Sequence, residues 1–185
     1  MDKANQFIET TSLEGLLVLK RPFFKDERGF FREIFHKDEL EAISGVSFEC
    51  VQLNHSRSMP GVLRGLHAEK WNKIISPVNG KAFLAIVDIR PDSQTFGKYE
   101  TFTINDENRF SLFIPNGMAN SICVIGEKAV DYFYLVDAYY DGLDTRAIVW
   151  NDPDLAIPWP VKNPVLSERD KNNPKFRDLF PEKFQ

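Results

Sequence analysis

The chain has 185 residues, of which 43% are hydrophobic, so it can bury the core of one domain. Its net charge of -4 argues against a general nucleic-acid binder, and its 2 cysteines argue against a disulfide framework. It shows no signal-peptide pattern and no apolar segment of bilayer-spanning length, so we expect a cytoplasmic protein with neither nucleic acid nor membrane as a partner.

Strand-length runs of apolar and aromatic residues recur along the chain, separated by turn residues. In chain order they are 16–19, 30–35, 48–53, 73–78, 82–89, 99–104, 110–114, 121–125, 129–136 and 146–150. Helices are expected over 36–43 and over 168–180, the second capped by Ser167. The pair Asn79-Gly80 predicts a two-residue hairpin. This pattern predicts an all-β sandwich or barrel with a few short helices, as one domain over 1–185 with a tail from about residue 160 wrapping the body.

The segment Gly61-Val62-Leu63-Arg64-Gly65-Leu66-His67 is the most informative stretch of the chain. Arg64 and His67 are three residues apart, so the regular alternation of a strand would place them on opposite faces. Gly65 lies between them, and glycine inside a strand often marks a bulge. We therefore expect a cation and a base to converge on one cavity.

Several kinds of catalytic site are excluded by the residue inventory. A metal cupin needs two or three histidines and a carboxylate around one ion, and only His55 and His67 form a plausible pair, so we expect no metal and no cofactor. The sequence also lacks a nucleophile elbow and a dinucleotide fingerprint. Proton transfer beside a carbonyl remains, with His67 as the base and Lys73 as the cation that stabilises the enolate. The opposing acid is a tyrosine, and the candidates are Tyr132, Tyr134, Tyr139 and Tyr140.

Motifs along most of the chain follow one another in a specific order and spacing. They are Asp26-Glu27-Arg28-Gly29-Phe30-Phe31-Arg32-Glu33, Gln52-Leu53-Asn54-His55-Ser56-Arg57-Ser58, 61–67, Val87-Asp88-Ile89-Arg90 with Ser93, Thr95 and Gly97, Ile114-Pro115, Tyr139-Tyr140, Trp150-Asn151-Asp152-Pro153, Ile157-Pro158-Trp159-Pro160 and Leu166-Ser167-Glu168-Arg169-Asp170. Over about residues 13–174 the chain resembles the dTDP-4-dehydrorhamnose 3,5-epimerase family, the cupin-type nucleotide-sugar epimerases.

The resemblance implies a jelly-roll fold, a homodimer, no metal, and a nucleoside-diphosphate 4-keto-6-deoxy sugar, dTDP-linked in the family, as substrate. His67 matches the family's base, Asp170 the carboxylate that pairs with it, and Tyr134 the acid. Lys73 matches the lysine near the enolate. The resemblance also implies that eight residues contact the substrate: Arg28, Glu33, Gln52, Asn54, Arg64, Asn120, Tyr140 and Arg169.

The chain also departs from the family's pattern. Asn120 stands where the family has a second active-site histidine, Ala68-Glu69 replace Phe-Gln, and the loop to Lys73 is short. Asparagine can form hydrogen bonds but cannot titrate near neutral pH. We therefore expect retained proton chemistry on a different sugar or at fewer carbons.

The resulting hypothesis is an epimerase that inverts C3, C5 or both through an enolate. It would serve the synthesis of a deoxysugar for a surface polysaccharide, such as lipopolysaccharide O-antigen, or for a glycosylated product. Two alternatives stay open. One is a 3,4-ketoisomerase that uses the same base on a similar substrate. The other is a non-catalytic cupin that only binds a nucleotide sugar.

Overall fold

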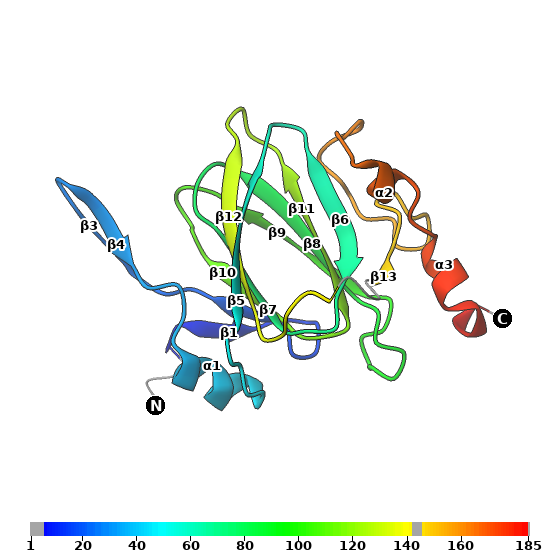
Figure 1. Cartoon of the computed structure of the whole chain (residues 1–185), viewed down its shortest axis with the longest axis horizontal. Coiled ribbons are helices and arrows are strands. Elements are labelled where there is room, and N and C mark those ends of the chain that lie inside the picture. The colour runs from blue at the N-terminus through cyan, green and yellow to red at the C-terminus, as the bar shows by residue number, and fades with distance from the viewer. Residues whose placement is uncertain (1–5, 142–145, 185) are drawn as a thin grey trace.

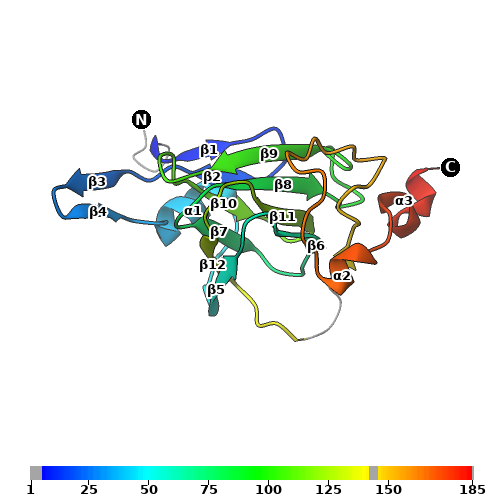
Figure 2. The same ribbon diagram turned by 90° about the horizontal axis from the view of Figure 1, so that it is seen from above.

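The computed structural model describes residues 6–141 and 146–184, and two antiparallel sheets form its body (Figures 1 and 2). The first sheet has the order β1 (Ile8–Thr10), β2 (Leu17–Leu19), β10 (Ser111–Ile114), β7 (Lys73–Pro77), β12 (Val130–Val136) and β5 (Gln52–Ser58). The second has the order β13 (Arg146–Ala147), β6 (Leu63–Ala68), β11 (Met118–Val124), β8 (Ala82–Asp88) and β9 (Tyr99–Ile104). This arrangement confirms the predicted all-β sandwich with few helices.

Three apolar clusters explain why the central strands read as continuous hydrophobic runs. Leu84 and Ile86 of one sheet meet Leu112 and Ile114 of the other in the core between them. The intervening residues of the same strands pack outward, because each sheet is covered on its outer face as well. A strand buried on both faces has no polar side to alternate with.

The outer face of the six-stranded sheet is covered by α1 (Lys37–Ser44), which begins one residue later than predicted. Leu40 of this helix packs with Phe113 and Ile74. The helix ends at Gly45, whose backbone lies in the left-handed region (φ 68°) that glycine adopts without strain.

The residues after 160 pack against the five-stranded sheet, where Phe176 and Phe180 are buried. The single helix predicted over 168–180 is wrong: the segment forms α2 (Glu168–Lys171), α3 (Phe176–Leu179) and the short 3-10 helix η2 (Pro181–Lys183). Pro174 separates the first two, because the residue before a proline avoids the helical region. Ser167 caps α2 as predicted, with its hydroxyl accepting from the Asp170 N–H at 3.1 Å. Among the described residues, no helix has the length and apolar character needed to cross a membrane.

Several strand predictions need correction. The run 48–53 is wrong in its bounds, since the strand occupies Gln52–Ser58 and Phe48 instead packs in the cluster under α1. The Asn79-Gly80 hairpin is wrong as well, because the strands on either side of it belong to different sheets. Asn79 instead binds Asp131 of β12 through its side chain, donating from Nδ2 and accepting from the backbone N–H.

A hairpin that the sequence did not predict as a pair stands away from the body in both views (Figures 1 and 2). Its strands are β3 (Phe23–Asp26) and β4 (Gly29–Arg32). Phe24 and Phe31 lie opposite each other and are 63% and 65% exposed, so the hairpin presents large apolar side chains to solvent.

Candidate active site

The strand that carries His67 is irregular in the way the sequence predicts. His67 pairs with Asn120 and Arg64 pairs with Ile122, so three steps on β6 span only two on β11. Gly65 has a φ of +133°, and a Cβ atom there would lie 2.6 Å from the Cβ of Ser121. The extra residue of this bulge turns Arg64 and His67 onto the same cavity.

That cavity lies between the two sheets and has a volume of about 220 Å³. We call it the sheet cavity. It is lined by Ser56, Arg64, His67, Glu69, Lys73, Ile75, Asn120, Ile122, Tyr132 and Tyr134. A second cavity of about 250 Å³, the aromatic cavity, is lined by Gln52, Asn54, His67, Glu69, Trp71, Tyr134, Val136, Tyr140 and Arg169. The shared residues are His67, Glu69 and Tyr134, so the two cavities adjoin there.

The imidazole of His67 is oriented by a carboxylate from the far end of the chain. Its Nε2 lies 2.6 Å from Oδ1 of Asp170, whose side chain is 4% exposed. Burial would raise the pKa of Asp170, but the hydrogen bond from His67 and its charge outweigh burial and lower that pKa. The carboxyl therefore stays ionised at neutral pH. No described residue hydrogen-bonds Nδ1 of His67, which leaves that nitrogen for the cavity.

Lys73 is almost fully buried, and its ammonium group has three neighbours. Nζ donates to Glu69 Oε1 at 2.8 Å and lies 3.5 Å from Asn120 Oδ1. It also lies 5.3 Å from the centre of the Tyr134 ring. A buried cation is stable when it is paired in this way.

Tyr134 comes from β12 and is the tyrosine that lines both cavities. Burial, then the nearby Tyr132 and Glu69, raise the pKa of its phenol, which therefore stays protonated at neutral pH. Tyr132 lines only the sheet cavity and Tyr140 only the aromatic cavity. Tyr139 is 70% exposed and lines neither, so the geometry favours Tyr134 among the four candidates.

The aromatic cavity brings together most of the predicted polar contacts. Gln52 and Asn54 project from β5 and are joined by a 2.7 Å hydrogen bond between their amides. Arg169 reaches the same cavity from α2, one residue before Asp170. Tyr140 packs edge-on against Trp71, with 6.3 Å between the ring centres.

Two residues predicted to contact the substrate, Arg28 and Glu33, do not line either cavity of their own chain. Arg28 sits at the turn of the β3–β4 hairpin, where its side chain is 84% exposed and pairs with Asp26. Glu33 follows the same hairpin, forms an ion pair with Arg21 and lies 3.1 Å from Nε2 of His36. Both lie outside the set of residues that line the cavities.

Sequence reasoning missed several cavity residues. Trp71 lies in the short loop before Lys73, and among the described residues its buried indole N–H has no hydrogen-bond partner. Glu69 stood out in the sequence only as a departure from the family pattern. Its spacing of four residues from Lys73, across the turn between two strands, is the signal that connects them.

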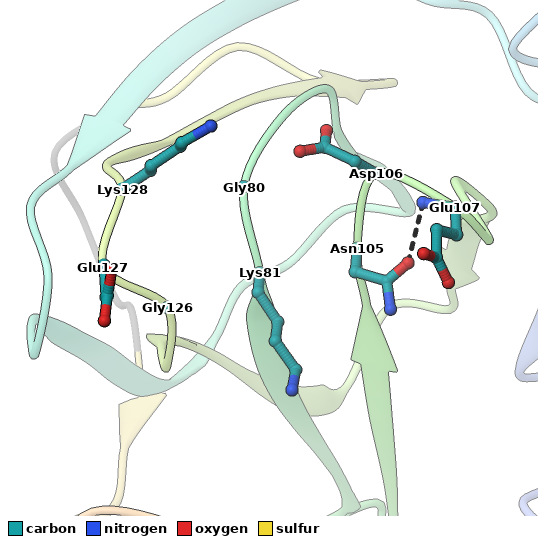
Figure 3. Close-up of a pocket in the computed structure, with 8 residues that line it drawn as sticks. All are labelled: Gly80, Lys81, Asn105, Asp106, Glu107, Gly126, Glu127 and Lys128. Carbon is teal, nitrogen blue, oxygen red and sulfur yellow. Dashed lines mark hydrogen bonds between the residues drawn. The ribbon is translucent and has the colours of Figure 1, made fainter.

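A further cavity lies between three turns (Figure 3). One of them follows β7 at the end of that strand opposite Lys73. Gly80, Asn105 and Gly126 each follow a strand, and the same turns carry Lys81, Asp106, Glu107, Glu127 and Lys128 (Figure 3). It contains none of the predicted site residues. Within the described part of the chain, no group of three or more His, Cys, Asp or Glu side chains is placed to hold a metal ion.

Comparison with known proteins shows the family of this chain. A family model described as dTDP-4-dehydrorhamnose 3,5-epimerase matches residues 10–178. The dTDP-4-dehydrorhamnose 3,5-epimerase of Shigella flexneri is 40% identical over 172 residues, which cover 91% of this chain and 94% of the relative.

Solved structures are similar over nearly the whole chain. The epimerase RmlC from Legionella pneumophila, in complex with dTDP-4-keto-L-rhamnose, has a TM-score of 0.87 and 35% identity, and the match covers 95% of each chain. ChmJ, a 3'-monoepimerase from Streptomyces bikiniensis in complex with dTDP-quinovose, has a TM-score of 0.86 and 28% identity, covering 95% of this chain and 90% of ChmJ.

These similarities make the two-sheet sandwich a cupin-type jelly roll, and they support an epimerase over a ketoisomerase or a non-catalytic binding protein. The chain therefore belongs to the dTDP-4-dehydrorhamnose 3,5-epimerase family and is an epimerase.

Proposed function

We propose that this enzyme inverts C5, C3 or both of a dTDP-linked 4-keto-6-deoxy hexose through an enolate. One observation carries the proposal: an imidazole held by a buried carboxylate shares a cavity with a buried ammonium and a protonated phenol. The complex of the Legionella relative with dTDP-4-keto-L-rhamnose supports the choice of substrate.

In the proposed reaction, His67 removes a proton from the carbon beside the C4 carbonyl. The free Nδ1 accepts this proton, and Asp170 stabilises the imidazolium that forms, because its carboxylate already accepts from Nε2. The electron pair of the broken C–H bond moves into the enolate. Lys73 stabilises the developing negative charge on the enolate oxygen.

Tyr134 completes the inversion by delivering its phenol proton to the opposite face of the same carbon. The raised pKa of Tyr134 keeps the phenol in its protonated form until the enolate is present. His67 then loses its proton and Tyr134 regains one from solvent, so the enzyme returns to its starting state and the net reaction is an isomerisation.

The remaining predicted residues fit the nucleotide part of the substrate. The guanidinium groups of Arg64 and Arg169 suit the paired oxygens of a diphosphate, and Tyr140 offers an aromatic surface for the base. The amides of Gln52 and Asn54 can each donate and accept, as sugar hydroxyls require. Binding energy at these distant groups positions the reacting carbon.

A homodimer would account for the exposed β3–β4 hairpin and for the position of Arg28 and Glu33 outside the cavities. A two-stranded hairpin is only marginally stable in water, and this one exposes aromatic side chains on both faces. A second copy of the chain would cover it, and the same contact would carry Arg28 and Glu33 toward the partner's cavities. Deoxysugar synthesis is the setting that the relatives support, and the cytoplasmic location stays a prediction.

Incubation of the enzyme with dTDP-4-keto-6-deoxyglucose in D2O, followed by proton NMR, tests the function. We expect deuterium at C5, C3 or both together with inversion.

His67→Ala should lose at least 100-fold in exchange rate while dTDP binding persists, because general bases contribute roughly 10²–10⁴-fold. His55→Ala is the matched control and should keep its activity, since His55 pairs with Asp131 outside both cavities. Undiminished exchange in His67→Ala would refute the assigned base, and binding without exchange in the wild type would favour a non-catalytic protein.

A further inference from the structure

Glu69 has no role in the proposed reaction, yet it lies where the sheet cavity and the aromatic cavity meet and lines both. Its side chain is 14% exposed. A carboxylate in such a position is costly unless donors surround it, so the groups that Glu69 contacts indicate what it is placed to bind.

Glu69 is held at both oxygens. Lys73 donates to Oε1 at 2.8 Å, and Asn120 Nδ2 donates to Oε2 at 3.1 Å. Asn120 Nδ2 also donates to the backbone oxygen of His67 at 2.8 Å. The amide of Asn120 is therefore engaged within the protein, and this residue positions Glu69 relative to His67.

The two ends of the ion pair present a donor beside an acceptor. Each oxygen of Glu69 accepts one hydrogen bond from the described residues, whereas an ionised carboxylate offers about four acceptor sites. The ammonium of Lys73 supplies the neighbouring donor. A ligand that matches this pair has an acceptor that faces Lys73 and, beside it, a hydroxyl that donates to Glu69.

A 4-keto sugar carries such an edge on one side only. The C4 carbonyl is the acceptor, and the hydroxyl on C3 is the donor beside it, while C5 bears a methyl group in a 6-deoxy sugar. We propose that Glu69 binds the C3 hydroxyl while Lys73 binds the C4 oxygen, which makes Glu69 a specificity-determining residue for α-hydroxy ketones. This inference rests on the proposed function.

The contact also fixes the orientation of the sugar. C3 and C5 both flank the carbonyl, so Lys73 alone cannot distinguish the ring from its flipped counterpart. When the C3 hydroxyl binds Glu69, C3 lies on the Glu69 side of the carbonyl and C5 lies on the opposite side.

The test compares the 4-keto-6-deoxy substrate with its 3-deoxy analogue, using kcat/KM for deuterium exchange at C5, or at C3 if the enzyme exchanges only that position. The wild type should prefer the hydroxylated substrate by roughly 10- to 100-fold, the range for a hydrogen bond to a charged group. In Glu69→Gln the bond becomes neutral, and the preference should fall by roughly 5- to 10-fold. Glu9→Gln is the matched control, because Glu9 also pairs with a lysine, Lys20, but at the surface of the far edge strand.

The outcomes separate the two proposals. Equal kcat/KM for both substrates in the wild type, or an unchanged preference in Glu69→Gln, would overturn the role of Glu69 and leave the epimerase function intact. Absence of exchange at both C3 and C5 of the hydroxylated substrate, in wild-type protein that binds dTDP, would overturn the proposed function itself. If Glu69→Gln does not fold, equal kcat/KM for the two substrates in the wild type would still overturn the role of Glu69.

Discussion

At the residue scale, His67 combines one constrained nitrogen with one open nitrogen. Asp170 fixes Nε2 at 2.6 Å, and the chain separates the two residues by 103 positions. Because Asp170 is nearly buried and stays ionised, the imidazolium of the proposed reaction would have a counter-charge that does not need to move. Preorganisation of this kind lowers a barrier without reorganisation cost at the moment of reaction.

Tyr134→Phe should separate proton removal from inversion. The base on one face is unchanged, so deuterium exchange with retention should persist, whereas inverted product should fall by roughly 10²–10⁴-fold because the acid on the other face is lost. Proton NMR in D2O measures both quantities in one sample. Tyr139→Phe is the control, since that exposed ring lines neither cavity. An equal loss of exchange and inversion in Tyr134→Phe would contradict the role of a second-face acid.

At the element scale, the bulge in β6 determines where the base points. If β6 kept all its residues but paired regularly, Arg64 and His67 would lie on opposite faces, and the sheet cavity would lose one of them. Gly65 makes the bulge possible, because its backbone conformation and its contact with β11 both exclude a side chain.

Gly65→Ala should destabilise the fold by about 2–4 kcal/mol, as it adds a steric clash with Ser121 to the strain of a positive φ. Gly45→Ala shares the positive φ, but its Cβ would meet nothing within 4 Å, so it should lose only about 1 kcal/mol. Chemical denaturation measures both free energies of unfolding. If both variants lost a similar free energy of unfolding, close packing of Gly65 against β11 would not be the cause of the destabilisation.

A second element, the loop between β8 and β9, is organised by Asp88. This buried carboxylate accepts hydrogen bonds from Arg90, Ser93 and Thr95, which explains why these residues recur at fixed spacing in the sequence motif. Burial would raise the pKa of Asp88, but these hydrogen bonds outweigh it and lower the pKa to about 2.

Asp88→Asn should lower the free energy of unfolding by about 2 kcal/mol at neutral pH, which is the size expected from that pKa shift. A lowered carboxyl pKa stabilises the fold above the unfolded-state value of 3.8, and this contribution is lost as the pH falls toward 2. The wild type and the variant should therefore converge in acid, which denaturation at several pH values measures. Asp92→Asn, at an exposed position in the same loop, should stay close to the wild type throughout.

At the scale of the whole molecule, residues of one chain line both cavities, but two predicted substrate contacts, Arg28 and Glu33, lie outside them. The β3–β4 hairpin carries Arg28 away from the body and exposes Phe24 and Phe31 (Figures 1 and 2). A two-fold dimer would give each hairpin a place against the other subunit.

Mixing inactive variants tests this arrangement. If Arg28 serves the partner's cavity, co-expression of His67→Ala and Arg28→Ala chains should recover about a quarter of the wild-type sites, since about half of the dimers are mixed and each has one intact site. If Arg28 serves its own chain, the mixture should recover nothing. Sedimentation of Phe24→Ser/Phe31→Ser, expected to shift toward monomer, provides the independent measure of assembly.

The sequence by itself determined the all-β class and, through the order and spacing of its motifs, the family. The residue types alone pointed to His67 and Lys73, whereas Asp170 and the choice of Tyr134 among four tyrosines came from the family resemblance. The bulge at Gly65 was also predictable, since only glycine combines a strand position with that backbone freedom. The roles of these residues stay predictions.

Tertiary structure alone decided the rest. The Asn79-Gly80 turn joins two sheets rather than two neighbouring strands, because Asn79 is bound to Asp131 across 52 positions of the chain. The engagement of Asn120 with Glu69 likewise follows from a contact between segments distant in sequence. Arg28 lies outside the cavities because it sits at the turn of the β3–β4 hairpin, which stands away from the body (Figure 1). Local sequence fixes which groups are present, whereas the packing of the two sheets fixes which of them meet.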